Sequence, residues 1–243
     1  MKVTLVNCTP EPEKTIYAAW MIMHKYPVKP FEVFVAQKGE YDPCLTSRKI
    51  VISIEDFKEA LRTITKQAHQ GALEMVHFNF LIEGVSRAFQ QQLTRTRQAS
   101  FCIQSLRVIR CDNFSDEGNF LPFGDARTKG DYYYGKAMED IQSAYRNMIA
   151  AGASTAQARG VLPLAIFSPI WMSINLRYLI HLVDKTVCTD VQGEFKAVAQ
   201  SMIEAIQAAH PLLAECFLRE FGCNRTKVCN GENPCGQHPS ETD

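Results

Sequence analysis

Alternating apolar and polar residues predict three strands. Residues 2–7 (KVTLVN) alternate and are rich in β-branched side chains, as edge and half-buried strands are. Residues 74–82 (EMVHFNFLI) place apolar side chains at every second position, so one face of this strand should be buried. That face consists of Val76, Phe78, Phe80 and Ile82. Residues 100–109 (SFCIQSLRVI) predict the third strand.

Helical spacing of apolar residues predicts two helices in the first third of the chain. In residues 9–26, Thr9 is the expected N-cap, acidic residues fill the first turn, and an apolar stripe follows. That stripe is Ile16, Ala19, Trp20 and Met23. In residues 53–69, Ser53 with Asp56 begins the helix. The expected buried positions there are Phe57, Leu61 and Ile64.

Five further helices are predicted, at residues 85–95, 132–152, 154–163, 173–185 and 191–213. Gly152 should end the second of these and Pro163 the third. Residues 111–131 are rich in turn formers and predict a long surface loop. Because strands and helices alternate without a regular βαβ rhythm, we expect one α+β domain, a mixed sheet flanked by long helices. It should span residues 1–215, with a cysteine-containing tail at 216–243.

Composition limits the possible partners. Apolar residues make up 46% and charged residues 21%, which is typical of globular proteins, and 26 basic residues balance 26 acidic ones. A net charge of zero disfavours nucleic acid and membrane surfaces as partners, so any anion site must be local. The most apolar segment contains Pro163, Pro169, Asn175 and Arg177, which suits a buried segment better than a membrane span. Without a signal-peptide pattern, we expect a soluble, cytoplasmic protein.

The sequence has nine cysteines, and their spacing argues against a disulfide scaffold. Five are scattered: Cys8, Cys44, Cys102, Cys111 and Cys188. Four others, with His238 close by, lie in the tail: Cys216, Cys223, Cys229 and Cys235. Because the tail lacks the tight Cys pair of zinc sites, we expect a loose tail and no metal, with zinc as the less favoured alternative.

A basic segment, residues 95–107 (RTRQASFCIQSLR), is the strongest candidate for chemistry. Arg95, Arg97 and Arg107 have almost no acidic neighbours, and Ser100 and Ser105 add hydroxyl donors. Guanidinium groups suit phosphate and carboxylate oxygens, so the segment predicts a phosphorylated ligand. The alternative is that these arginines pair with distant carboxylates or line a subunit interface. RNA binding ranks lower because the net charge is zero.

The spacing Arg95-x-Arg97, seven residues, Ser105, and then Arg107 resembles the signature of the flavin-dependent thymidylate synthases. Other blocks resemble the same family in the same order: residues 2–14, 73–97, 158–163, 175–182 and 191–195. The resemblance thus extends over roughly residues 1–215. It implies an enzyme that methylates dUMP to dTMP, with methylenetetrahydrofolate as carbon donor and NADPH as reductant of FAD. It also implies a homotetramer with sites built from several subunits.

The resemblance implies roles for individual residues. FAD would be bound by Arg95, Thr96, Arg97 and Ile103, and from a later helix by Asn175, Arg177 and His181. The nucleotide would be bound by Gln92, Arg95, Ser105, Leu106, Arg107 and Arg159. Nearest the chemistry would lie Arg95, Ser105, His69, Glu74, Lys185 and Thr186.

Simpler interpretations exist for four of these residues. His181 is a candidate core histidine, and His69 a histidine at a helix end. Glu74 is a candidate surface acid, and Asn175 a candidate helix N-cap.

The chain departs from the family pattern mainly around the pyrimidine. Thr96 stands where the family usually has His, and Met75 follows Glu74 where His is common. Cys102 and Ile103 replace polar residues. Thr186 aligns with an arginine that the family uses against uracil, and Lys185 is its neighbour.

These departures leave alternatives to dUMP methylation, which stays the first hypothesis. One is action on a cytosine deoxynucleotide or formation of a 5-hydroxymethyl product, because threonine does not oppose cytosine as arginine would. The other is a non-catalytic protein that binds flavin or nucleotide.

Overall fold

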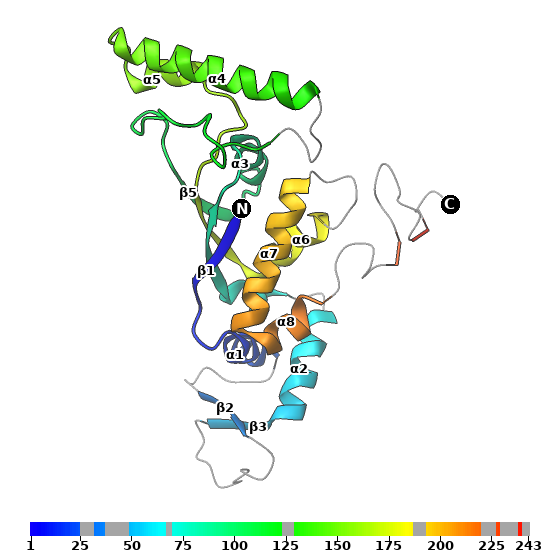
Figure 1. Cartoon of the computed structure of the whole chain (residues 1–243). Coiled ribbons are helices and arrows are strands. Elements are labelled where there is room, and N and C mark those ends of the chain that lie inside the picture. The colour runs from blue at the N-terminus through cyan, green and yellow to red at the C-terminus, as the bar shows by residue number, and fades with distance from the viewer. Residues whose placement is uncertain are drawn as a thin grey trace. The chain divides into compact units, whose positions relative to one another are not determined.

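The larger sheet of the computed structural model has four strands in the order β1-β4-β6-β5 (Figure 1). The structure describes residues 1–24, 32–36, 49–66, 70–122, 129–186, 193–219, 227–228 and 238–239. The strands are β1 (Lys2–Cys8), β2 (Glu32–Ala36), β3 (Lys49–Ser53), β4 (His77–Glu83), β5 (Ala99–Ile103) and β6 (Ile170–Asn175).

The helices are α1 (Pro12–His24), α2 (Ile54–Lys66), α3 (Arg87–Leu93), α4 (Lys129–Ala150), α5 (Thr155–Ala158), α6 (Leu176–Thr186), α7 (Gly193–Ala209) and α8 (Pro211–Phe217). Two short 3₁₀ helices are η1 (Gly71–Met75) and η2 (Arg159–Val161). The α+β class predicted from the sequence is confirmed. None of the helices in the described ranges is both long and apolar enough to cross a membrane.

The first of two compact units comprises Met1–Thr4 and Leu81–Met172. Figure 1 shows α5 lying along α4, and the core beside α4 is built from Phe114, Met138, Tyr145, Ala158 and Ile166. Side chains of α4 also bind the loop that follows β5. Tyr145 Oη accepts from the Cys111 amide at 3.3 Å, and Gln142 Oε1 accepts from the Ser115 amide at 2.8 Å. The predicted loop at 111–131 is irregular but anchored over residues 111–122; residues 123–128 lie outside the described residues, and residues 129–131 already belong to α4.

The predicted end of α4 is confirmed at Gly152. Gly152 has a φ of 91°, which favours glycine. Its amide donates to Ile149 O at 3.0 Å, and the next amide, of Ala153, donates to Met148 O at 3.0 Å. This pair of bonds satisfies carbonyls that the helix itself leaves without partners.

The second unit comprises Leu5–Phe80 and Ser173–Asp243. Its core is helical. Helix α8 contacts α1, α2 and α7, α1 also contacts α2, and α7 also contacts α6. The predicted start of α2 is confirmed, because Ser53 Oγ accepts from the Asp56 amide at 3.1 Å. Phe57, Leu61 and Ile64 are buried as predicted. Strands β2 and β3 pair in parallel in this unit, and the sequence analysis did not predict that small sheet.

The predicted start of the first helix is wrong. The Thr9 amide donates to His77 O at 3.0 Å, and Thr9 Oγ1 accepts from the His77 amide at 2.9 Å. Because Thr9 bonds to β4 in this way, the helix begins only at Pro12. The predicted stripe is partly wrong as well, since Ile16 is buried but Met23 is 48% exposed. Tyr17 and Met21 on the same helix are also buried.

Strand β4 confirms the period-two prediction, because Phe78, Phe80 and Ile82 are all buried, as is Val76 just before it. Other boundaries differ. Residues 173–175, predicted as helix, complete strand β6, and β5 ends at Ile103 rather than near Ile109. The last predicted helix is two helices, since Pro211 cannot donate an amide bond within α7 and instead begins α8. The division at residue 215 stays a prediction.

Candidate functional site

The turn after α3 carries the first part of the predicted site. Ser86 caps α3, with its Oγ accepting from the Phe89 amide at 3.0 Å. The helix then ends in a turn in which the Arg95 amide donates to Gln92 O at 3.1 Å and the Thr96 amide to Leu93 O at 3.0 Å. Gln92, Arg95 and Arg97 are exposed, and Thr96 is half-buried. The turn therefore presents two guanidinium groups to solvent.

A second turn, after β5, carries Ser105 and Arg107. Ser105 Oγ accepts from the Arg107 amide at 3.3 Å, and the Ser105 carbonyl accepts from the Ile109 amide at 3.0 Å. Thr155 Oγ1, at the start of α5, donates to the Arg107 carbonyl. Arg159 follows Thr155 by one helical turn, at the end of α5. The structure thus fixes the Ser105 turn against the short helix that carries Arg159.

Leu106 and Ile103 are less exposed than these polar residues. The Leu106 side chain packs against the core beside α4, which anchors the turn between Ser105 and Arg107. Ile103 is half-buried at the end of β5, and Cys102 before it is exposed. The two departures from the family pattern therefore point to different sides of the strand.

The predicted arginines have no acidic partners in the part of the chain that the structure describes. No ion pair or side-chain hydrogen bond there involves the guanidinium groups of Arg95, Arg97, Arg107 or Arg159. The alternative of internal pairing therefore finds no support among the described carboxylates. Exposed guanidinium groups without acidic partners suit a phosphate or pyrophosphate.

Arg87 was not among the predicted site residues, yet it contacts the same segment. Its Nη2 donates to Gln104 O at 2.7 Å and its Nη1 to Gln90 Oε1 at 2.8 Å. Burial lowers the pKa of Arg87, Cys111 opposes this, and the positive charge of Arg159 lowers the pKa further. Arg87 and Arg159 are thus near enough to repel. Its sequence signal was its place in the block at 73–97, where it is the first residue of α3.

The start of α6 carries the second group of predicted residues. Asn175 Oδ1 accepts from the Tyr178 amide at 3.0 Å, which confirms the helix-cap interpretation of Asn175. The Leu176 amide donates to Val76 O at 2.8 Å and so fixes the helix to the end of η1. Glu74 lies in η1, and its carboxylate forms an ion pair with Arg177 Nη1. Two residues that the resemblance placed near the flavin are therefore in direct contact.

One face of α6 is basic. Arg177, His181 and Lys185 follow one another at intervals of four residues, and such residues share a helix face. The opposite face, which includes Leu179 and Leu182, is buried. His181 is exposed, so the interpretation of a core histidine is wrong.

Thr186 lies on the buried side of α6. It is 3% exposed, and its hydroxyl donates to Val183 O at 2.8 Å. Lys185 is exposed. Of this pair, Lys185 is the side chain that presents a charge to solvent. His69, the remaining predicted residue, lies outside the described residues, as do Cys44, Cys188 and most of the tail.

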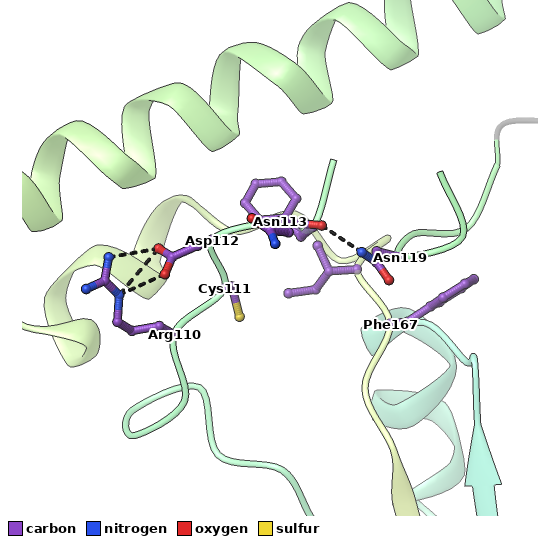
Figure 2. A pocket seen from close by; sticks show the side chains of 8 residues that line it. Arg110, Cys111, Asp112, Asn113, Asn119 and Phe167 are labelled. Carbon is purple, nitrogen blue, oxygen red and sulfur yellow. Dashed lines mark hydrogen bonds and ion pairs between the residues drawn. The ribbon is translucent and has the colours of Figure 1, made fainter. Parts of the chain in front are cut away.

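A pocket of ≈ 360 Å³ lies in the first unit, in the loop after β5 (Figure 2). Its polar side is formed by the Arg110–Asp112 ion pair and by Asn113 and Asn119, joined by a bond from Asn119 Nδ2 to Asn113 O at 2.8 Å. Cys111, Phe114, Ile166 and Phe167 complete the lining. None of the predicted site residues lines this pocket, and the turn-rich sequence did not indicate it.

Comparison with known families bears on the same residues. The family model described as "Thymidylate synthase complementing protein" matches residues 4–212. The chain belongs to this family. The match includes every predicted site residue and ends close to the boundary expected between the domain and the tail.

Relatives agree with this assignment over nearly the whole chain. A flavin-dependent thymidylate synthase from Nitratidesulfovibrio vulgaris is 32% identical over 252 residues, covering 98% of this chain and 95% of the relative. One from Pyrococcus abyssi is 32% identical over 208 residues, covering 85% of this chain and 79% of the relative. The sequence-based resemblance to flavin-dependent thymidylate synthases is confirmed.

Solved structures show the same fold. The flavin-dependent thymidylate synthase ThyX from Helicobacter pylori, complexed with FAD and dUMP, aligns with a TM-score of 0.63 and 20% identity. The alignment covers 89% of this chain and 100% of that chain. A second structure of the H. pylori enzyme with FAD and dUMP gives a TM-score of 0.65 over 90% of this chain. The α+β architecture is therefore that of the family.

Proposed function

We propose that this protein methylates dUMP to dTMP, with methylenetetrahydrofolate as carbon donor, NADPH as reductant and FAD as cofactor. One observation carries the proposal beyond family membership. The Thr155–Arg107 bond joins the turn that carries Ser105 and Arg107 to the short helix that ends at Arg159. The guanidinium groups of Arg107 and Arg159 have no acidic partner among the described residues. Such a group matches the phosphate dianion of a nucleotide.

The nucleotide half of the proposed site is in the first unit. Arg107 and Arg159 would bind phosphate oxygens through paired N–H donors, and Ser105 would add its hydroxyl. The Leu106 side chain packs in the core, so its part would be a backbone contact. Gln92 and Arg95, exposed at the end of α3, would orient the rest of the nucleotide. Holding the nucleotide fixed beside the flavin would supply much of the rate enhancement.

Each unit, taken by itself, offers residues that suit part of a flavin dinucleotide. Arg95 and Arg97 offer charge for its pyrophosphate, and Thr96 and Ile103 offer one hydroxyl and one apolar side chain beside them. Asn175 uses only its oxygen as the cap of α6, which leaves its amide N–H groups for a ligand. Arg177 and His181 extend the exposed face of α6. When bound, FAD supplies the hydride; the protein contributes binding, orientation and charge.

Base recognition is the part of the proposed site where the chain departs most from the family pattern. Thr186 is buried and gives its hydroxyl to its own helix, so Lys185 would be the charged group beside the pyrimidine. A lysine is a point charge rather than a planar fork, and this favours a second candidate function. That candidate is action on a cytosine deoxynucleotide, or release of a 5-hydroxymethyl pyrimidine nucleotide. Glu74 and His69 would lie toward the flavin and folate.

The decisive experiment incubates purified protein with FAD, NADPH and labelled methylenetetrahydrofolate, and separately with dUMP or dCMP. Mass spectrometry of the nucleotide products should show dTMP from dUMP alone. Turnover of dCMP alone, or a hydroxymethyl product, would replace the first function by the second. A yellow protein that binds flavin without any nucleotide product would instead support a binding protein without catalysis.

We also propose a cytoplasmic homotetramer. Tyr132 and Tyr133 on α4 are 67% and 69% exposed, which is unusual for two adjacent aromatic side chains of a monomer. A site shared among subunits would explain why Arg95 and Arg97 point outward. Light scattering of the purified protein should give four times the chain mass of 27.4 kDa. A monomeric mass would remove this part of the proposal.

A further inference from the structure

Arg87 connects two parts of the candidate nucleotide site. It is the first residue of α3, and Gln90 one turn later accepts from its Nη1 at 2.8 Å. The Nη2 of the same guanidinium donates to the Gln104 carbonyl at 2.7 Å. One side chain therefore holds the loop after β5 against the helix that leads to Arg95.

The contact with Gln104 also sets the direction of the next residue. The Gln104 carbonyl and the Ser105 amide belong to one planar peptide group, in which the C=O and N–H bonds point in opposite directions. With the carbonyl held by Arg87, the Ser105 N–H points away from Arg87. Ser105 Oγ in turn accepts from the Arg107 amide at 3.3 Å.

Arg159, the remaining residue proposed to bind the phosphate, is linked to the same turn. The Arg107 carbonyl accepts from Thr155 Oγ1, and Arg159 lies one turn along that helical segment. A shift of the Gln104–Ser105 peptide would therefore move all three residues proposed to bind the phosphate, which are Ser105, Arg107 and Arg159.

The surroundings of Arg87 are costly for a purely structural residue. Its Nε is buried and has no hydrogen-bond partner among the described residues. Burial is the main cause that lowers its pKa; Cys111 raises the pKa, and repulsion from Arg159 lowers it by less. A phosphate dianion bound near Arg159 would offset that repulsion.

We propose that Arg87 is a positioning residue of the nucleotide phosphate site, acting through the Gln104–Ser105 peptide. This inference rests on the proposed function, because it assumes that the Ser105 turn binds the phosphate of a nucleotide. It predicts that Arg87 affects binding of the phosphate and not of the nucleoside.

The experiment compares dUMP with deoxyuridine, which lacks the phosphate, by calorimetric titration of the FAD-loaded protein. Arg87→Lys keeps the charge but lacks the fork needed for both contacts. We expect it to raise the Kd of dUMP about tenfold, the scale of one hydrogen bond to a charged group. The Kd of deoxyuridine should change less than about twofold, and kcat at saturating dUMP less than about threefold, because the reacting groups stay in place.

Gln90→Leu is the matched control. It removes the acceptor of Nη1 and leaves the Gln104 contact, so the Kd of dUMP should rise less than about threefold, because the Gln104–Ser105 peptide stays bonded to Arg87. In Arg87→Lys, an unchanged ratio of the Kd of dUMP to the Kd of deoxyuridine would overturn the positioning role, whether both affinities fall together or neither changes. The wild-type titration separates the two proposals. Failure of the wild type to bind dUMP would overturn both, whereas normal wild-type binding with an unchanged ratio would overturn only the role of Arg87.

Discussion

The guanidinium of Arg177, in the first turn of α6, is paired with the carboxylate of Glu74 in η1. The two residues are 103 positions apart in sequence. Their side chains are 42% and 34% exposed, so the pair is screened and contributes little to folding stability. We expect the pair to orient a side chain instead: Glu74 should direct Arg177 along the exposed face of α6 that also carries His181.

The first prediction concerns this orientation. Glu74→Gln should raise the Kd of FAD about three- to tenfold, as expected when a guanidinium loses a charged partner that directs it. The free energy of unfolding should change by less than about 1 kcal/mol because the pair is partly exposed. Flavin fluorescence measures the first quantity and urea denaturation the second.

A control variant separates orientation from a general loss of negative charge. Glu59 pairs with Arg62 at 3.9 Å on α2, where no predicted site residue lies. Glu59→Gln should leave FAD binding unchanged. Equal losses of FAD affinity in both variants would rule out a specific role of the Glu74–Arg177 pair.

The second prediction concerns the phosphate. Arg107→Met and Arg159→Met should each raise the KM of dUMP by about 10- to 100-fold, since each removes charge-assisted hydrogen bonds of about 1.5–3 kcal/mol. Steady-state kinetics at saturating NADPH and folate measure the effect. Arg110→Met is the control, because Arg110 is similarly exposed but pairs with Asp112. A normal KM in Arg107→Met would contradict the assignment of this turn.

The fold was predictable wherever local pattern and tertiary packing agree. Phe78, Phe80 and Ile82 alternate in sequence and are buried together in β4, so the local period gave the right face. Thr9 shows the opposite case. It is a good cap by residue type, but its bonds to His77 join it to a strand 68 residues away, and local sequence carries no signal of that contact. Non-local pairing of this kind also accounts for the missed strand β6.

The candidate site was predictable to a different extent. Arg95, Arg97, Ser105 and Arg107 are close in sequence, so one motif marked them. The contact of Glu74 with Arg177 needed the fold, although both residues had been singled out. Arg87 was missed because its role depends on which carbonyl its guanidinium meets, and residue type alone does not determine that. The burial of Thr186 likewise follows from the phase of α6 rather than from its alignment with an arginine.

The third prediction tests the start of α2. Ser53→Ala removes the hydroxyl that accepts from the Asp56 amide, and loss of such a cap costs about 1 kcal/mol. Urea denaturation should show this as a lower midpoint with an unchanged slope. Ser143→Ala is the control, since Ser143 lies within α4 and its hydroxyl donates to Glu139 O, where alanine favours the helix. A loss in Ser143→Ala as large as that in Ser53→Ala would refute the capping explanation.

The fourth prediction concerns alkaline pH. Burial raises the pKa of the Cys8 thiol above the ordinary value of 9.0, and the nearby carboxylate of Glu13 raises it further. Burial also raises the pKa values of Cys111 and Cys216. In the unfolded chain these thiols ionise at lower pH than in the folded protein. The unfolded state therefore binds fewer protons in this range, and stability must fall as pH rises.

The stabilisation from the neutral thiols should thus be complete below the ordinary pKa of 9.0 and be lost as pH rises through the raised folded values. Cys8→Ala lacks one of these groups. Cys8 Sγ lies 3.0 Å from His210 Nε2, so the variant should be less stable at neutral pH, yet it should lose less further stability between about pH 8 and pH 10 than the wild type does. Urea denaturation across that range under reducing conditions measures the slope. Cys102→Ala, at an exposed position on β5, is the control and should follow the wild-type slope. Parallel curves for Cys8→Ala and wild type would show that the half-buried Cys8 thiol does not govern the alkaline loss.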